Sequence, residues 1–174
     1  MKKRIILAVT AAATLLLLLI AVQIVRHKLR MRLVARLPDI ELLSADSILF
    51  RTGTLAADTL PLLVLYFHPE CEFCAAEISD LLEHRDAATG IRFLLVTFAS
   101  PEEIRNHFRL FPEARPANFT VATDYKGDFV RTFDVKAPPA NYLYDRHRKL
   151  IRVHKGMLSF EQLQHYLAIR TEPG

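Results

Sequence analysis

The sequence has only two cysteines, and both belong to one motif. Because Cys71 and Cys74 can form at most one disulfide between them, a framework of several structural disulfides is excluded. A zinc site of four cysteines is excluded as well, since no second cysteine pair exists to complete it. Sparing use of cysteine outside one motif is typical of an oxidising compartment, where stray thiols would mispair.

Acidic residues are absent from the first 36 positions, which hold eight lysines and arginines. Residues 37–174 carry 15 basic and 19 acidic side chains, a net charge of −4. The high isoelectric point therefore belongs to the N-terminal arm. The rest of the chain has no basic stripe and no nucleic-acid-binding motif, which argues against a nucleic-acid partner. With 174 residues and 51% apolar content, the chain is long enough for one domain with a full core.

No charged residue occurs between Ile5 and Val25. As a helix rising about 1.5 Å per residue, these 21 residues cross a hydrocarbon layer of about 30 Å. A cleaved signal peptide is the alternative. Its apolar core is usually about 7 to 15 residues long and a site of small residues follows it, whereas Arg26 follows here. We predict an N-terminal tail at 1–4 and an uncleaved transmembrane anchor at 5–25.

Residues 26–37 alternate basic with apolar side chains and are predicted to form a basic juxtamembrane linker. They form either a helix against anionic head groups or a solvated continuation of the anchor. Three basic residues precede the predicted span and five follow it by position 36. Positive charge alone therefore predicts that the C-terminal side faces the cytoplasm.

A single α/β domain is predicted from 38 to 170, with a mixed sheet covered by helices on both faces. The sequence contains no internal repeat. The run 91–98 is almost entirely apolar, as buried parallel strands are. Ser100, Pro101 and Glu103 form a helix-start signal. The expected strands are 40–43, 48–51, 62–67, 91–98, 119–122, 141–144 and 150–154, and the expected helices are 72–84, 100–110, 124–133 and a final one from 159.

The most informative stretch is the buried strand 62–67, which leads through a turn at Pro69 to Cys71 and Cys74 at the start of a helix. The free N–H groups and partial positive charge of a helix N-terminus favour a thiolate over a thiol. We therefore predict a redox dithiol in which Cys71 is the exposed sulfur and Cys74 lies one helical turn below it. Cys71 attacks a substrate disulfide, and Cys74 then attacks the sulfur of Cys71 and releases the reduced substrate.

Three neighbours are predicted to modulate the dithiol. Glu70 and Glu72 flank Cys71, and their negative charge opposes thiolate formation. His68 either assists as a cation or simply faces solvent beside the turn. This balance predicts a moderately reducing couple rather than a strong oxidant.

Other uses of the motif are less favoured. A structural disulfide closing so short a loop removes little chain entropy. His68, Cys71 and Cys74 are three evenly spaced soft ligands that suit a metal such as copper, but no fourth ligand forms a paired motif with them. The remaining histidines are expected at the surface. Seven phenylalanines are expected in or near the core: Phe93, Phe98, Phe108, Phe111, Phe119, Phe129 and Phe133.

The chain resembles thioredoxin-fold proteins, most closely the membrane-anchored TlpA/ResA-type thiol–disulfide oxidoreductases and related redoxin domains. The resemblance covers about residues 37–167 and lies in three segments: 37–42, 66–74 and 135–145. It implies a cis proline that faces the dithiol and holds the substrate chain extended. That proline is Pro139, preceded by Pro138, which lacks the N–H that the family usually offers to the substrate. A peroxidase with one reactive cysteine is disfavoured, because His68 stands where peroxiredoxins have Thr or Ser.

Two further departures from the family concern the surroundings of the dithiol. Glu70 replaces the aromatic residue that often precedes the first cysteine. Leu65 stands where thioredoxins keep a buried acid, so another group or water must take the proton of Cys74. Glu77 is a candidate, although a solvated position on the helix is expected for it.

The resemblance implies an enzyme that needs no metal or organic cofactor beyond the Cys71–Cys74 disulfide. Its expected partners are protein thiols or disulfides in exported proteins, a thiol electron donor or acceptor, and the membrane. The expected location is the bacterial inner membrane, in a single pass, with the domain in the periplasm or outside the cell. The alternative is a non-enzymatic thioredoxin-fold module that binds a partner or a metal.

Overall fold

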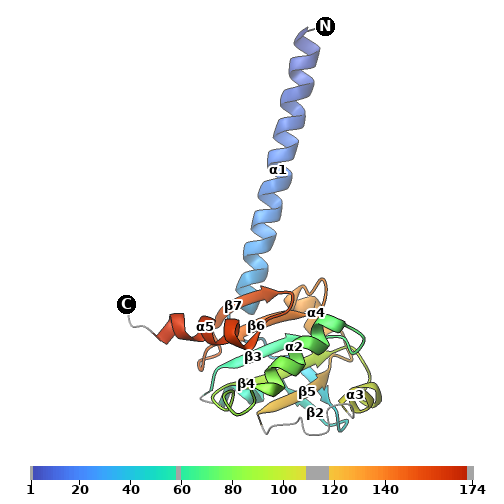
Figure 1. The fold of residues 1–174 in the computed structure, drawn as a ribbon. Coiled ribbons are helices and arrows are strands. Elements are labelled where there is room, and N and C mark those ends of the chain that lie inside the picture. The colour runs from blue at the N-terminus through green and yellow to red at the C-terminus, as the bar shows by residue number, and fades with distance from the viewer. Residues whose placement is uncertain (1, 58–59, 109–117, 172–174) are drawn as a thin grey trace.

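The computed structural model describes residues 2–57, 60–108 and 118–171. Within them the predicted α/β architecture is confirmed, since one mixed sheet has helices on both faces (Figure 1). Its strand order is β2-β1-β5-β4-β3-β6-β7. The strands are β1 (Glu41–Ser44), β2 (Leu49–Arg51), β3 (Leu62–Tyr66), β4 (Arg92–Thr97), β5 (Phe119–Thr123), β6 (Ala140–Tyr144) and β7 (Leu150–Lys155). The helices are α1 (Lys2–Val34), the 3₁₀ helix η1 (Thr52–Ala57), α2 (Glu72–Glu83), α3 (Pro101–Phe108), α4 (Asp128–Phe133) and α5 (Phe160–Thr171).

The centre of the sheet is built from the apolar strands β3 and β4. They run parallel, with β6 antiparallel on the other side of β3. All five residues of β3 are buried, which explains its continuous apolar sequence. At its carboxyl end Tyr66 is opposite both Val96 of β4 and Ala140 of β6. The turn that follows β3 therefore lies beside the segment that precedes β6.

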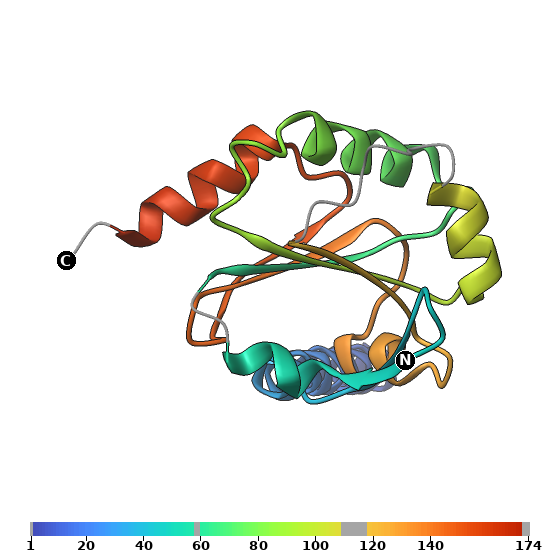
Figure 2. The same cartoon turned by 90° about the horizontal axis from the view of Figure 1, so that it is seen from below.

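Two hydrophobic cores lie on the two faces of the sheet. Helices α2, α3 and α5 cover one face, and α4, η1 and the end of α1 cover the other (Figure 2). Helix α5 contributes Phe160, Leu163, Tyr166 and Leu167 to its core, and the last three form the face predicted from their spacing.

Helix α1 projects away from the domain, and only its C-terminal end is packed against it (Figure 1). Val34 is buried, and its carbonyl accepts a 3.0 Å hydrogen bond from the Tyr144 hydroxyl. The N–H of Leu150 donates to the carbonyl of Ala35 at 2.9 Å. These bonds hold the end of α1 on strands β6 and β7.

Among the residues that the structure describes, no helix meets the length and apolar character needed to cross a membrane. The predicted span at 5–25 includes positions, Ile5 among them, whose side chains lie outside the described part.

Local signals in the sequence account for several element boundaries. Ser100 and Glu103 exchange hydrogen bonds at the start of α3, where the N–H of Ser100 donates to Glu103 Oε2 at 2.7 Å and the N–H of Glu103 donates to Ser100 Oγ at 3.2 Å. The carboxylate of Asp124 accepts from the N–H groups of Phe129 and Val130, which fixes the start of α4. Residues 109–110, at the predicted end of α3, and Phe111 lie outside the described residues.

The turn between β6 and β7 depends on the buried side chain of Arg148, which donates to the carbonyls of Leu55 and Leu60. We expect Arg148→Met to lower the free energy of unfolding by about 2–3 kcal/mol, because two partly buried carbonyls lose their charged donor. Urea unfolding of the full chain measures this. Arg146→Met, at an exposed position of the same turn, is the matched control and should stay within about 0.5 kcal/mol of wild type.

Candidate active site

The dithiol lies where the buried strand β3 passes into α2. Cys71 is the N-cap of α2, and its Sγ accepts the backbone N–H of Cys74 at 3.2 Å. The N–H of Cys71 donates to the carbonyl of His68 at 3.0 Å, which closes the turn between strand and helix. The first cysteine is thus held at the end of a helix whose N–H groups and dipole favour negative charge on sulfur.

Cys71 and Cys74 are joined by a disulfide, with their Cα atoms 5.2 Å apart. Their surroundings differ. Cys71 is half-buried, whereas Cys74 is 0% exposed and belongs to the core beneath α2. A substrate sulfur can therefore approach Cys71 but not Cys74.

The Pro138–Pro139 peptide bond is cis, as the resemblance to thioredoxin-fold proteins implied. Ala140, the next residue, is paired with Tyr66 at the end of β3, so the register brings Pro139 to the same end of the sheet as the dithiol turn. Pro139 is buried and Pro138 is exposed. The carbonyl of Pro139 accepts the N–H of Gly156 at 2.9 Å.

The three predicted modulating residues surround the turn. His68 is half-buried, and its Nδ1 accepts the N–H of Glu70 at 3.2 Å. Its ring packs against Phe98, with centroids 4.8 Å apart. Glu70 and Glu72 are exposed. Among the described residues, no group of three or more His, Cys, Asp or Glu side chains is placed to hold a metal ion.

The expectation of a solvated Glu77 is wrong, because this side chain is 0% exposed. It lies one helical turn after Cys74, on the face of α2 that also carries Ile78 and Leu81. Within the described residues, neither carboxyl oxygen has a hydrogen-bond partner. Burial raises the pKa of Glu77 to about 8, and the nearby Leu158 backbone and Asn141 side chain offset that rise only in part. The i+3 spacing from Cys74 was the signal that could have revealed it.

Two other expectations about side chains are also wrong. Phe98 is not in the core but 59% exposed, lying over His68. His107 is half-buried rather than at the surface, with its ring near Phe67 and Phe108. Burial lowers the pKa of His107.

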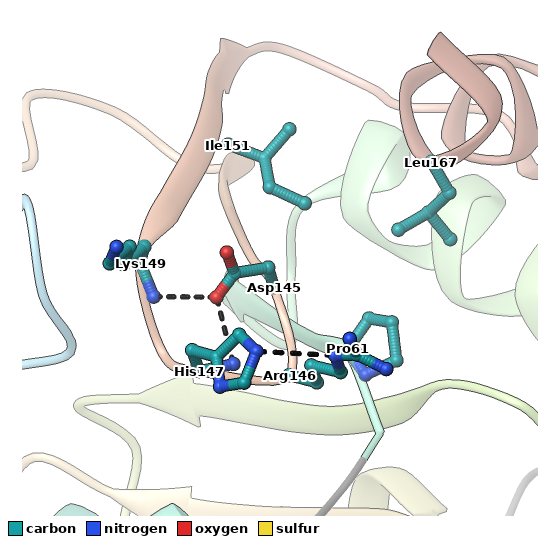
Figure 3. Close-up of a pocket in the computed structure, with 7 residues that line it drawn as sticks. All are labelled: Pro61, Asp145, Arg146, His147, Lys149, Ile151 and Leu167. Atoms are coloured by element: carbon teal, nitrogen blue, oxygen red, sulfur yellow. Dashed lines mark hydrogen bonds between the residues drawn. The ribbon is translucent and has the colours of Figure 1, made fainter. Parts of the chain in front are cut away.

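A separate pocket of about 580 Å³ lies at the opposite end of β3 from the dithiol, beside the β6–β7 turn (Figure 3). Asp145 accepts the N–H groups of His147 and Lys149 there, and Arg146 Nε donates to His147 Nε2. Ile151 and Leu167 form its apolar side (Figure 3). It contains no cysteine, so it is not part of the redox site.

The mixed sheet and the cysteine pair at the N-terminus of α2 define a thioredoxin-like redox protein. The sequence matches the AhpC/TSA family over residues 35–153, and the chain belongs to that family. The family and the cysteine pair together confirm the prediction of a thioredoxin-like oxidoreductase. The comparison with curated proteins gives no match.

Solved structures with the same fold include three redox proteins. MTB DsbF has a TM-score of 0.63 and 19% identity, covering 76% of this chain and 95% of its own. A putative thiol:disulfide interchange protein DsbE from Chlorobium tepidum has a TM-score of 0.63 and 19% identity, covering 77% and 94%. The peroxidoxin BcpB from Mycobacterium tuberculosis has a TM-score of 0.63 and 15% identity, covering 80% and 96%. At these identities the likeness establishes the fold.

Proposed function

We propose that the chain is a membrane-anchored thiol–disulfide oxidoreductase that reduces or exchanges disulfides in exported proteins through Cys71 and Cys74. The observation that carries this proposal is the asymmetry of the pair, with an accessible sulfur at the helix N-cap and a buried sulfur one turn below. The similarity of the fold to a putative thiol:disulfide interchange protein DsbE and to DsbF, which has oxidised and reduced forms, supports it.

In the reductive direction, the Cys71 thiolate attacks one sulfur of a substrate disulfide. The substrate S–S bond breaks, a mixed disulfide forms with Cys71, and the other substrate sulfur leaves as a thiolate that takes up a proton. Cys74 loses its proton and attacks Cys71 Sγ, which releases the second substrate thiol and forms the Cys71–Cys74 disulfide. Two electrons pass to the substrate, and a thiol donor must return them to the protein.

Glu77 is the group that we assign to the proton of Cys74. Cys74 is buried away from water, and Glu77 is the buried acid one turn further along α2. A pKa near 8 lets its carboxyl gain and lose a proton close to neutral pH. Glu77 thus supplies the buried acid that thioredoxins keep at the position held here by Leu65.

Pro138 and Pro139 are assigned to substrate docking. The register beside β3 supports this role, since it brings the exposed Pro138 to the dithiol end of the sheet. Because Pro138 has no N–H, a docked chain gains no hydrogen bond from that residue's nitrogen.

A redox titration tests the proposed chemistry. We expect the full chain to show a two-electron dithiol–disulfide couple in glutathione buffers. Thiol alkylation and mass spectrometry measure the reduced fraction at each buffer potential. Cys71→Ser is expected to remove the couple entirely. Stoichiometric metal binding without a dithiol couple would instead support the metal-binding alternative.

The membrane attachment is proposed from α1. Its leucines from Leu15 to Leu19 are 56–65% exposed, and the helix extends beyond the domain (Figure 1). We place the domain on the extracytoplasmic side, because a dithiol enzyme of this kind needs substrate thiols that can oxidise. The count of positive charges argues for the opposite side.

Thiol alkylation of intact cells tests the orientation. We expect a membrane-impermeant maleimide to label reduced Cys71 without lysis, and the chain to stay with membranes after a carbonate wash. Labelling only after lysis would place the domain in the cytoplasm. Release by carbonate would contradict the anchor.

A further inference from the structure

Two exposed aromatic rings lie close to the dithiol. Phe73, between the two cysteines, is 70% exposed, and Phe98 is 59% exposed. Phe98 follows β4, and its ring packs on His68, whose carbonyl holds the N–H of Cys71. Apolar surface of this kind, next to a sulfur that must meet another sulfur, is typical of a contact surface for a partner.

Four carboxylates lie near these rings in the sequence. Glu70 and Glu72 flank Cys71, and Glu102 and Glu103 follow Phe98 in the first turn of α3; all four are exposed. Hydrogen bonds from Ser100, with a smaller contribution from His68, lower the pKa of Glu103, so this carboxyl is charged at neutral pH.

Within the part of the chain that the structure describes, none of these four carboxylates forms an ion pair. The segments 68–73 and 98–103 contain no lysine or arginine. Arg105, further along α3, donates to the carbonyl of Ala45. Lys136, on the loop before Pro138, is paired with Asp134 at 2.7 Å.

We infer that this rim, formed by Phe73, Phe98, Glu70, Glu72, Glu102 and Glu103, selects polypeptide partners whose cysteine is flanked by a cationic and an apolar side chain. The inference rests on the proposed function and names the substrate class of that site. The rings bury the apolar neighbour of the target cysteine, and the carboxylates attract the cation and speed the encounter.

Synthetic peptides test the inference. Each carries one cysteine in a mixed disulfide with 2-mercaptoethanol, flanked by Lys and Leu, by Glu and Leu, or by Lys and Ser. The dithiol of the reduced full chain converts each peptide to peptide thiol and 2-mercaptoethanol and becomes the Cys71–Cys74 disulfide. The protein is first reduced with dithiothreitol, which is removed before mixing. Chromatography then follows the peptide thiol and gives second-order rate constants.

We expect the Lys–Leu peptide to react about tenfold faster than the Glu–Leu peptide at low ionic strength, and within about twofold at 0.5 M salt. It should also react about fivefold faster than the Lys–Ser peptide. The triple variant Glu70→Gln, Glu72→Gln, Glu102→Gln should lose the preference for Lys over Glu. Phe98→Ala should reduce the preference for Leu over Ser.

The ratio of the rate constants for two peptides separates recognition from reactivity, since a changed reactivity of the Cys71 thiol alters the rate constants of all peptides by the same factor. Glu161→Gln and Ile169→Ala, at exposed positions of α5, are the matched controls and should keep both ratios. Exchange with all peptides at equal rates overturns the inference and leaves the proposed function intact. No exchange with any peptide or with hydroxyethyl disulfide overturns both.

Discussion

Cys74→Ser is expected to accumulate a stable mixed disulfide between Cys71 and a substrate thiol, whereas Cys71→Ser is expected to form none. In the first variant the accessible sulfur at the helix N-cap still attacks, but no second sulfur remains to release the product. In the second, the remaining sulfur is 0% exposed and cannot be reached. We expect Cys71→Ser to lower the exchange rate by about 10³-fold or more, as loss of a nucleophile does.

Mass spectrometry of each variant after reaction with hydroxyethyl disulfide measures the trapped adduct and its position. The double variant Cys71→Ser, Cys74→Ser gives the background. An adduct on Cys74 in the Cys71→Ser variant would contradict the assignment of roles. In cell extracts, the adduct of Cys74→Ser would also identify the natural partners.

Glu77→Gln is expected to stabilise the protein above neutral pH and to leave it nearly unchanged at pH 4. The folded-state pKa is about 8, against an ordinary value of 4.5 that we take for the unfolded chain. Above pH 4.5 the unfolded chain releases this proton while the folded chain keeps it. The contribution of the protonated group to stability is therefore complete below 4.5, falls as the pH rises toward 8, and is then lost.

The size of this effect follows from the gap between the two pKa values. At about 1.4 kcal/mol per pH unit, the gap corresponds to roughly 4 kcal/mol by pH 8. The neutral amide of Gln does not titrate, so urea unfolding at pH 4, 6 and 8 should show a growing advantage for the variant. Glu161→Gln on α5 is the exposed control. If the difference in free energy of unfolding between Glu77→Gln and wild type did not depend on pH, it would contradict a buried Glu77 carboxyl with a raised pKa.

The same variant separates the catalytic proposal for Glu77 from its effect on stability. If Glu77 takes the proton of Cys74, Glu77→Gln should slow the release of substrate from the mixed disulfide with Cys71. The first attack should be unaffected, because it does not involve Cys74. Rapid acid quenching resolves the two steps.

The positions of strands and helices could be predicted because the signals for them are local. The apolar run before Cys71, the capping pair Ser100 and Glu103, and the hairpin of β6 and β7 each depend on neighbours within a few residues. The placement of Pro139 beside the dithiol needed one more step, since it depends on the pairing of Tyr66 with Ala140.

The side chains around the dithiol depend on contacts between elements far apart in the sequence. The spacing on α2 places Glu77 on one face with Cys74, but only the packing of that face on the sheet decides that the Glu77 carboxyl is buried away from water. Phe98 looked like a core residue because an apolar ring usually is; its position just beyond β4 leaves it over His68 instead.

By itself, the sequence determined the order of elements and the dithiol at the start of a helix, because backbone preference and periodicity act over a few residues. The cis candidate Pro139 came from the resemblance to thioredoxin-fold proteins. Only the tertiary structure decided that Cys74 and Glu77 are buried together, that Phe98 is exposed beside the dithiol, and that the end of α1 is fixed to β6 and β7. Burial is a property of the whole packed chain. Because burial sets the pKa of Glu77 and the accessibility of each sulfur, these two properties depend on the whole packed chain as well.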